Sequence, residues 1–118
     1  MKKLLSIVEQ GGYPDFTAMY REAGYDVQQT ASIREATRWL KKNVADIIVT
    51  EFNYDPYFRD RLSNVETIAS IAERHPETRL VVLYDKDAEA QFKRLEEQYR
   101  FHGELVFPID EAALKALL

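Results

Sequence analysis

The stretch Asp46-Ile47-Ile48-Val49-Thr50-Glu51 decides how the rest of the chain is interpreted. It is a short apolar run, rich in β-branched side chains, with an acid at each end. A run of this length and composition is typical of a strand that is buried on both faces of a parallel sheet. Ligands of such sheets bind beyond the carboxyl ends of the strands. We therefore take Glu51, at the carboxyl end of the run, as the reference point for a functional site.

The composition is that of a globular protein with one hydrophobic core. At 118 residues the chain fits a single domain, which we expect to span residues 1–118. Hydrophobic residues make up 46% of the chain and charged residues 31%, which argues against intrinsic disorder. The net charge of -4, with no obviously basic face, argues against nucleic-acid binding. There are no cysteines, so disulfides and thiolate metal sites are excluded.

The apolar run near the N-terminus, Leu4 to Val8, is too short for a signal peptide or for a membrane span. We therefore expect a cytoplasmic protein that does not interact with a membrane.

Runs of apolar residues predict five strands and, between and after them, five helices. The expected strands are 4–8, 25–30, 46–51, 79–84 and 105–107. The expected helices are 14–24, 32–43, 63–75, 85–101 and 110–118. Ser32 followed by Glu35 is a capping-box pattern, and Gly103 is expected to close the fourth helix. The regular alternation predicts an α/β domain whose parallel sheet has helices on both faces.

Several strings, in this order, resemble the receiver domain of bacterial two-component response regulators. They are Ala23-Gly24-Tyr25, Ala31-Ser32-Ile33-Arg34-Glu35-Ala36, Asp46-Ile47-Ile48-Val49-Thr50-Glu51, Leu80-Val81-Val82-Leu83-Tyr84 and Leu105-Val106-Phe107-Pro108-Ile109-Asp110. The resemblance extends over essentially the whole chain. It implies a flavodoxin-like (CheY-like), doubly wound, five-stranded sheet with strand order 2-1-3-4-5, and a role in signalling.

The resemblance also implies where a phosphorylation site would lie. The family uses an aspartate at the end of the third strand as phospho-acceptor and two acids after the first strand to hold Mg²⁺. It uses a Ser or Thr after the fourth strand and a Lys at the end of the fifth. The matching positions here hold Glu51, the pair Glu9 and Gln10, Tyr84, and Phe107. These departures point to an atypical or pseudo-receiver that has no catalysis of its own.

We expect Glu51, Glu9 and Tyr84 to meet at the carboxyl edge of the sheet, with the Phe107 ring packed beside them as an apolar plug. Glu104 stands where the family has an aromatic residue that relays the state of the site, and it is a candidate partner-binding residue. No cofactor is expected, although Glu9 and Glu51 are candidate ligands for Mg²⁺; the alternative is two solvated acids. A further alternative is that Glu51 imitates the charge of a phosphorylated aspartate.

The segment from 52 to 63 is a candidate binding loop. It contains Tyr54, Tyr57, Phe58 and Arg59, and aromatic residues and Arg are enriched at binding hot spots. The alternative is that some of these rings fold back over the end of the sheet. The expected partners are signalling proteins, such as a histidine kinase or an output or transcription factor, or a second copy of the chain.

Three functions fit these observations. The first is a stand-alone, phosphorylation-independent interaction module of response-regulator type. The second is a receiver that still accepts phosphate, with altered active-site chemistry. The third is a small flavodoxin-like nucleotide or flavin binder, although the loop Glu9-Gln10-Gly11-Gly12 has neither a lysine nor a phosphate-cradling pattern.

Overall fold

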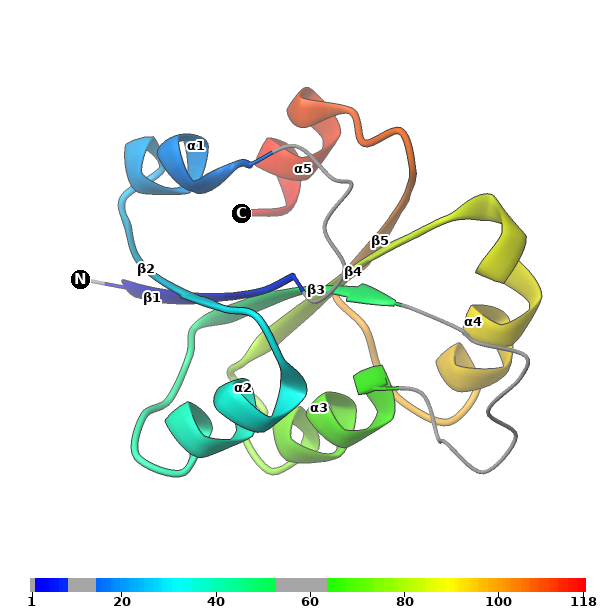
Figure 1. Cartoon of the computed structure of the whole chain (residues 1–118), viewed down its shortest axis with the longest axis horizontal. Helices are drawn as coiled ribbons and strands as arrows, with labels where there is room; N and C mark the ends of the chain where they lie inside the picture. The colour runs from blue at the N-terminus through cyan, green and yellow to red at the C-terminus, as the bar shows by residue number, and fades with distance from the viewer. Residues whose placement is uncertain (1, 9–14, 53–63) are drawn as a thin grey trace.

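A computed structural model describes residues 2–8, 15–52 and 64–118 of the chain. Within these ranges five parallel strands form one sheet in the order β2-β1-β3-β4-β5 (Figure 1). The strands are β1 (Lys2–Ile7), β2 (Tyr25–Thr30), β3 (Ile47–Phe52), β4 (Arg79–Tyr84) and β5 (Gly103–Val106). The predicted doubly wound fold and its strand order 2-1-3-4-5 are confirmed.

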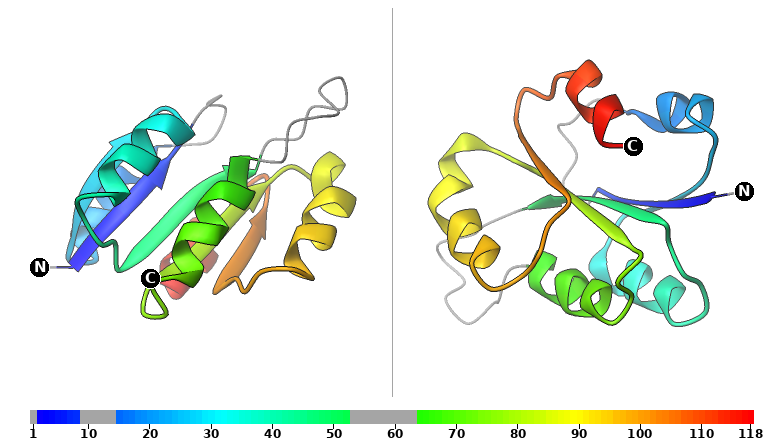
Figure 2. Two further views of the ribbon diagram at one scale, coloured as in Figure 1. Left: turned by 90° about the horizontal axis from the view of Figure 1, so that it is seen from below. Right: turned by 180° about the vertical axis from the view of Figure 1, so that it is seen from behind.

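Helices cover both faces of the sheet (Figures 1 and 2). On one face lie α1 (Thr17–Glu22) and α5 (Glu111–Leu117). On the other face lie α2 (Ile33–Leu40), α3 (Asn64–Glu73) and α4 (Glu89–Glu96). The capping box predicted for α2 is present, since the Glu35 N–H donates to Ser32 Oγ at 3.1 Å. The Glu35 carboxylate in turn accepts from the backbone N–H of Ala31 at 3.0 Å.

β3 is the central strand, and all six of its residues are buried. Side chains of successive strand residues point to opposite faces of a sheet. Accordingly, Ile48 and Phe52 belong to the core cluster beneath α2, α3 and α4. Ile47 and Val49 belong to the cluster beneath α1 and α5. The strand thus joins the two halves of the hydrophobic core.

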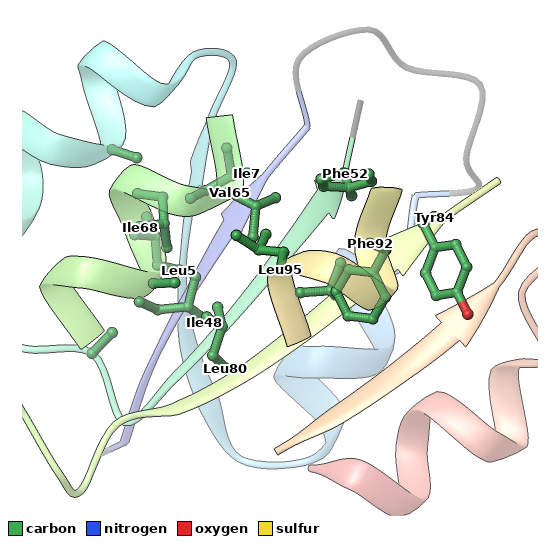
Figure 3. Packing of buried hydrophobic residues seen from close by; sticks show 14 of the residues in the cluster. Leu5, Ile7, Ile48, Phe52, Val65, Ile68, Leu80, Tyr84, Phe92 and Leu95 are labelled. Carbon is green, nitrogen blue, oxygen red and sulfur yellow. The ribbon is translucent and has the colours of Figure 1, made fainter. Parts of the chain in front are cut away.

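Phe92 of α4 is the centre of an aromatic group in the larger cluster (Figure 3). Its ring is stacked on Tyr84 at 4.8 Å between centroids and meets Phe52 edge-on at 5.7 Å. The ring centroid of Phe101 lies 5.2 Å from that of Phe92. These contacts hold α4 against the carboxyl-terminal halves of β3 and β4.

The fourth helical segment is shorter than the sequence predicts. A single helix over 85–101 was expected, but the structure has a 3₁₀ turn at Lys86–Ala88 and then α4, which ends at Glu96. The side chain of Asp85 caps the turn by accepting from the Asp87 N–H at 3.0 Å. After Glu96 the chain leaves the helix, which brings Phe101 onto the fully buried ring of Phe92. Tertiary packing therefore overrides the helical preference of the charged sequence.

Gly103 does not close a helix but begins β5. A Cβ atom at this position would lie 2.7 Å from side-chain carbons of Leu117, in α5. The glycine therefore allows α5 to approach the edge strand closely. The strand ends at Val106, so Phe107, which the sequence placed in it, follows it instead.

Replacement of Phe92 by Ala should lower the free energy of unfolding by about 3–5 kcal/mol, because it removes the ring on which three others pack. Chemical denaturation monitored by circular dichroism measures this loss. Phe92→Leu, which keeps an apolar side chain there, is the matched control and should lose clearly less. Equal, small losses in both variants would show that the aromatic group does not hold α4.

Candidate functional site

Glu51 lies near the carboxyl end of β3, between the ends of β1 and β4. It is in register with Leu83 of β4, and on the other side Thr50 is in register with Ile7 of β1. The strand positions therefore agree with the predicted alignment. Only 1% of the Glu51 surface is exposed, so this carboxylate is not the solvated acid that the alternative interpretation required.

A cavity of about 130 Å³ opens beside Glu51 on the face that α1 and α5 cover. Apolar side chains of the neighbouring strands and helix supply part of its lining. The polar residues among the described lining are Ser6, Asp15, Tyr20, Gln29 and Glu51. Two carboxylates on one small cavity make this edge of the sheet acidic.

Hydrogen bonds and burial set the protonation states beside the cavity. The Thr17 hydroxyl donates to Asp15 Oδ1 at 2.6 Å, and the Thr17 N–H donates to the same oxygen at 2.9 Å. These two bonds hold the pKa of Asp15 below its usual range, and it is charged at neutral pH. Burial, together with the charge of Asp15, raises the pKa of Tyr20, which remains a neutral phenol.

The side chain of Tyr84 does not join this cavity. Tyr84 is in register with Phe52, and its ring is stacked on Phe92 in the cluster beneath α2, α3 and α4 (Figure 3). Glu51 instead faces the opposite side of the sheet, together with Leu83. The expectation that Glu51 and Tyr84 meet is therefore wrong for their side chains, although their strands are adjacent. Burial, and secondarily the charge of Glu104, raises the pKa of Tyr84.

Phe107 lies at the carboxyl edge of the sheet, just after β5, and its ring does not form the predicted apolar plug. Its backbone N–H donates to the carbonyl oxygen of Tyr84 at 2.7 Å, which continues the pairing of β5 with β4. Its side chain, however, remains 39% exposed. The expected burial of the ring is incomplete because β5 ends one residue earlier, at Val106.

Glu104 connects β5 to α4. Its Oε1 lies 3.0 Å from Lys93 Nζ, which also lies 3.3 Å from Glu96 Oε1. The hydrogen bond to Glu104, followed by the one to Glu96, raises the pKa of Lys93. Val106, 38% exposed, follows two residues later at the end of the edge strand. This surface combines an ion-paired network with exposed apolar side chains.

The remaining residues of the predicted site lie outside the described ranges. They are Glu9, Gln10, Tyr54, Tyr57, Phe58 and Arg59. Mg²⁺ binding by Glu9 and Glu51 therefore stays a prediction. Among the described residues, no group of three or more His, Asp or Glu side chains could hold a metal ion. No helix in the described parts of the chain is long and apolar enough to cross a membrane.

Sequence reasoning missed Ser6, Asp15, Tyr20 and Gln29 as lining residues. Two of them have a positional signal: Gln29 is next to last in the predicted strand 25–30, and Asp15 follows the loop after the first predicted strand. Ser6 is the middle residue of the predicted strand 4–8, although it is next to last in the observed β1. Tyr20 has no such signal, because its place depends on how α1 packs on the sheet.

Comparison with known proteins finds similarity in structure only. No family model matches the sequence, and no curated protein matches it. A response regulator receiver domain from Clostridium thermocellum has a TM-score of 0.77 at 17% identity, over 99% of this chain and 90% of that one. The Vibrio cholerae chemotaxis protein CheY4 has a TM-score of 0.71 at 22% identity, over 99% of this chain and 96% of that one.

A structure described as adenylate cyclase from Rhodopirellula baltica is also similar, with a TM-score of 0.71 at 14% identity over 98% of this chain and 82% of that one. One fold carries different functions, so at these identities the likeness establishes architecture alone. Together with the observed strand order, it shows that the chain has the flavodoxin-like fold of response-regulator receiver domains.

Proposed function

We propose that the protein is a stand-alone, phosphorylation-independent signalling module of response-regulator type. It acts in the cytoplasm by binding another protein and catalyses no reaction. The observation that carries the proposal is the separation of Glu51 from Tyr84. The acid faces a small cavity on one side of the sheet, and the ring is stacked on Phe92 on the other.

Phosphotransfer to a carboxylate needs several groups gathered around the same oxygen. A hydroxyl and a cation must stabilise the charge of the transferred group, and misplacement by about 1 Å can reduce the rate roughly 10²-fold. Here the hydroxyl position holds Tyr84, whose ring packs away from Glu51, and the lysine position holds Phe107. Glu51 is also one methylene longer than aspartate. All three features support a domain whose state is not set by phosphate.

The surface formed by α4 and β5 is the proposed contact for a partner. β5 is an edge strand, and Val106 and Phe107 at its end are both more than a third exposed. The ion pair between Lys93 and Glu104 borders these apolar side chains. Exposed apolar groups rimmed by charges are typical of interaction surfaces. The partner is a histidine kinase, an output or transcription factor, or a second copy of the chain.

A receiver with altered chemistry is the second candidate. It is favoured by the two carboxylates, Asp15 and Glu51, that line one cavity at the carboxyl edge. A nucleotide or flavin binder finds less support at this cavity. The cavity of about 130 Å³ is smaller than the ~300–1,000 Å³ of typical ligand pockets.

Incubation with Mg²⁺ and acetyl phosphate should leave the mass of the intact protein unchanged, because the groups that stabilise an acyl phosphate are not gathered at Glu51. Intact-mass spectrometry measures the result, with a receiver of known phosphorylation as the positive control for the donor. A stable gain of one phosphoryl group, lost in Glu51→Gln, would establish the second candidate instead.

Phe107→Lys should lower the free energy of unfolding by roughly 1 kcal/mol, less than a fully buried ring would lose, because the side chain is 39% exposed. The variant should still take up no phosphate, since Glu51 and Tyr84 are unchanged. Thermal melting and the phosphodonor assay measure the two effects. A melting temperature equal to or above that of the wild type would show that the ring is not packed, and phosphate uptake would contradict the proposal.

Val106→Asp should abolish capture of the partner from cells that express the tagged protein, because it places a charge among the apolar groups of the proposed surface. Val44→Asp is the matched control, since Val44 is 57% exposed and precedes β3, away from β5. Quantitative mass spectrometry of the captured proteins, beside size-exclusion chromatography for self-association, compares the variants. Equal capture by both would rule out this surface.

A further inference from the structure

The amino-terminal edge of the sheet, opposite Glu51, contains a basic cleft of about 330 Å³. It lies where the loop before β4 meets the segment that leads into β5, and Figure 2 shows both segments at this edge. The charged or titratable residues among its described lining are Arg79, Arg100 and His102. Phe101 and Pro76 add apolar surface beside them.

Two of the three basic side chains are oriented by oxygen atoms of other elements. Arg79 Nη2 donates to the Tyr25 hydroxyl at 2.8 Å, and that hydroxyl donates to the backbone oxygen of Leu118 at 2.7 Å. His102 Nε2 lies 3.1 Å from the backbone oxygen of Leu117. These contacts fix the orientation of the Arg79 and His102 side chains.

No ion pair is found for this cluster in the described part of the chain. The ion pairs found there all involve Lys93, on α4, and none involves Arg79, Arg100 or His102. Arg79 and Arg100 thus place two guanidinium groups on one cleft, and neither forms an ion pair with a described residue. Guanidinium groups that form no ion pair within the protein favour the binding of an anion from solution.

We propose that this cleft binds a small molecule through a phosphate group. The guanidinium group presents several N–H donors in a fixed plane that matches phosphate oxygens. A phosphate monoester carries up to two negative charges, which suits the two arginines better than a single carboxylate does. The volume lies within the ~300–1,000 Å³ range of small-molecule sites, and Phe101 provides a wall for the apolar part of the ligand.

The cleft is independent of the proposed interaction function. Arg79 begins β4 and Tyr84 ends it, so the two edges are about 17 Å apart along the strand. A phosphate group bound at Arg79 would not contact Glu51 or the surface at Val106. The inference therefore adds a second site and does not depend on whether Glu51 accepts phosphate.

Titration with pyrophosphate in a phosphate-free buffer of low ionic strength tests the proposal. Isothermal calorimetry should show saturable binding, and amide signals of residues 78–80 and 100–103 should shift in NMR spectra while those of residues 50–52, at the opposite edge, do not. Arg100→Gln should weaken binding about tenfold or more through the loss of a charge-assisted contact. Arg38→Gln, which changes the charge equally on an exposed residue of α2, should bind like the wild type.

Citrate, titrated in the same way, distinguishes phosphate from carboxylate recognition. Pyrophosphate binding at least tenfold tighter than citrate binding supports the proposal, and equal or tighter citrate binding overturns it. No saturable binding of pyrophosphate would also overturn it. Equal weakening in Arg100→Gln and Arg38→Gln would mean that only net charge matters, and this too would refute a site at the cleft. Arg100 is exposed, so its replacement should leave the melting curve unchanged.

Discussion

Burial of β3 on both faces is the constraint on which the other elements depend. A strand that exposes none of its six residues needs a helical layer above and below it, and a neighbouring strand on each side. Right-handed crossovers between parallel strands supply both layers. The positions of α1 and α5 on one face, and of α2, α3 and α4 on the other, follow from the need to cover this strand and its neighbours.

The same burial gives each residue of β3 a fixed face. A shift of one position would exchange the two sets of side chains, moving Glu51 into the aromatic cluster and Phe52 toward the acidic cavity. The register with β4 gives the residues of that strand the same alternation of faces, because Glu51 is opposite Leu83 and Phe52 is opposite Tyr84. The aromatic stack on Phe92 then stabilises Tyr84 on its own face. What separates the acid from the tyrosine is therefore the pleat of the sheet, reinforced by packing.

Most of the fold could be predicted from the sequence, because apolar runs and turn residues report local structure directly. The capping box at Ser32 and the strand order agree with the structure, and the strand predicted at 46–51 is observed one residue later, at Ile47–Phe52. Errors arose where a distant contact decides the local conformation. The contact of Phe101 with Phe92 accompanies the early end of α4, and the approach of Leu117 requires Gly103. Neither contact leaves a periodic signal in the sequence.

The candidate site was predicted less well than the fold, for a related reason. Resemblance to a family assigns a residue to a strand end, but the direction of its side chain depends on what packs around it. Tyr84 has a large ring where the family has a small hydroxyl residue, and it enters the core beside Phe92. The cavity at Glu51 combines side chains from β1, β2, β3, β4 and α1 with residues around them, so its lining can be identified only once these elements are assembled.

Charge is distributed unequally between the two edges of the sheet, and the net charge conceals this. Asp15 and Glu51 line the cavity at the carboxyl edge, whereas Arg79, Arg100 and His102 line the cleft at the amino edge. The absence of an obviously basic run in the sequence therefore did not exclude a basic site. The edges are about 17 Å apart, roughly twice the ~8 Å Debye length at physiological ionic strength. Each edge consequently presents its own field to an approaching molecule, and a ligand attracted to one is not repelled by the other.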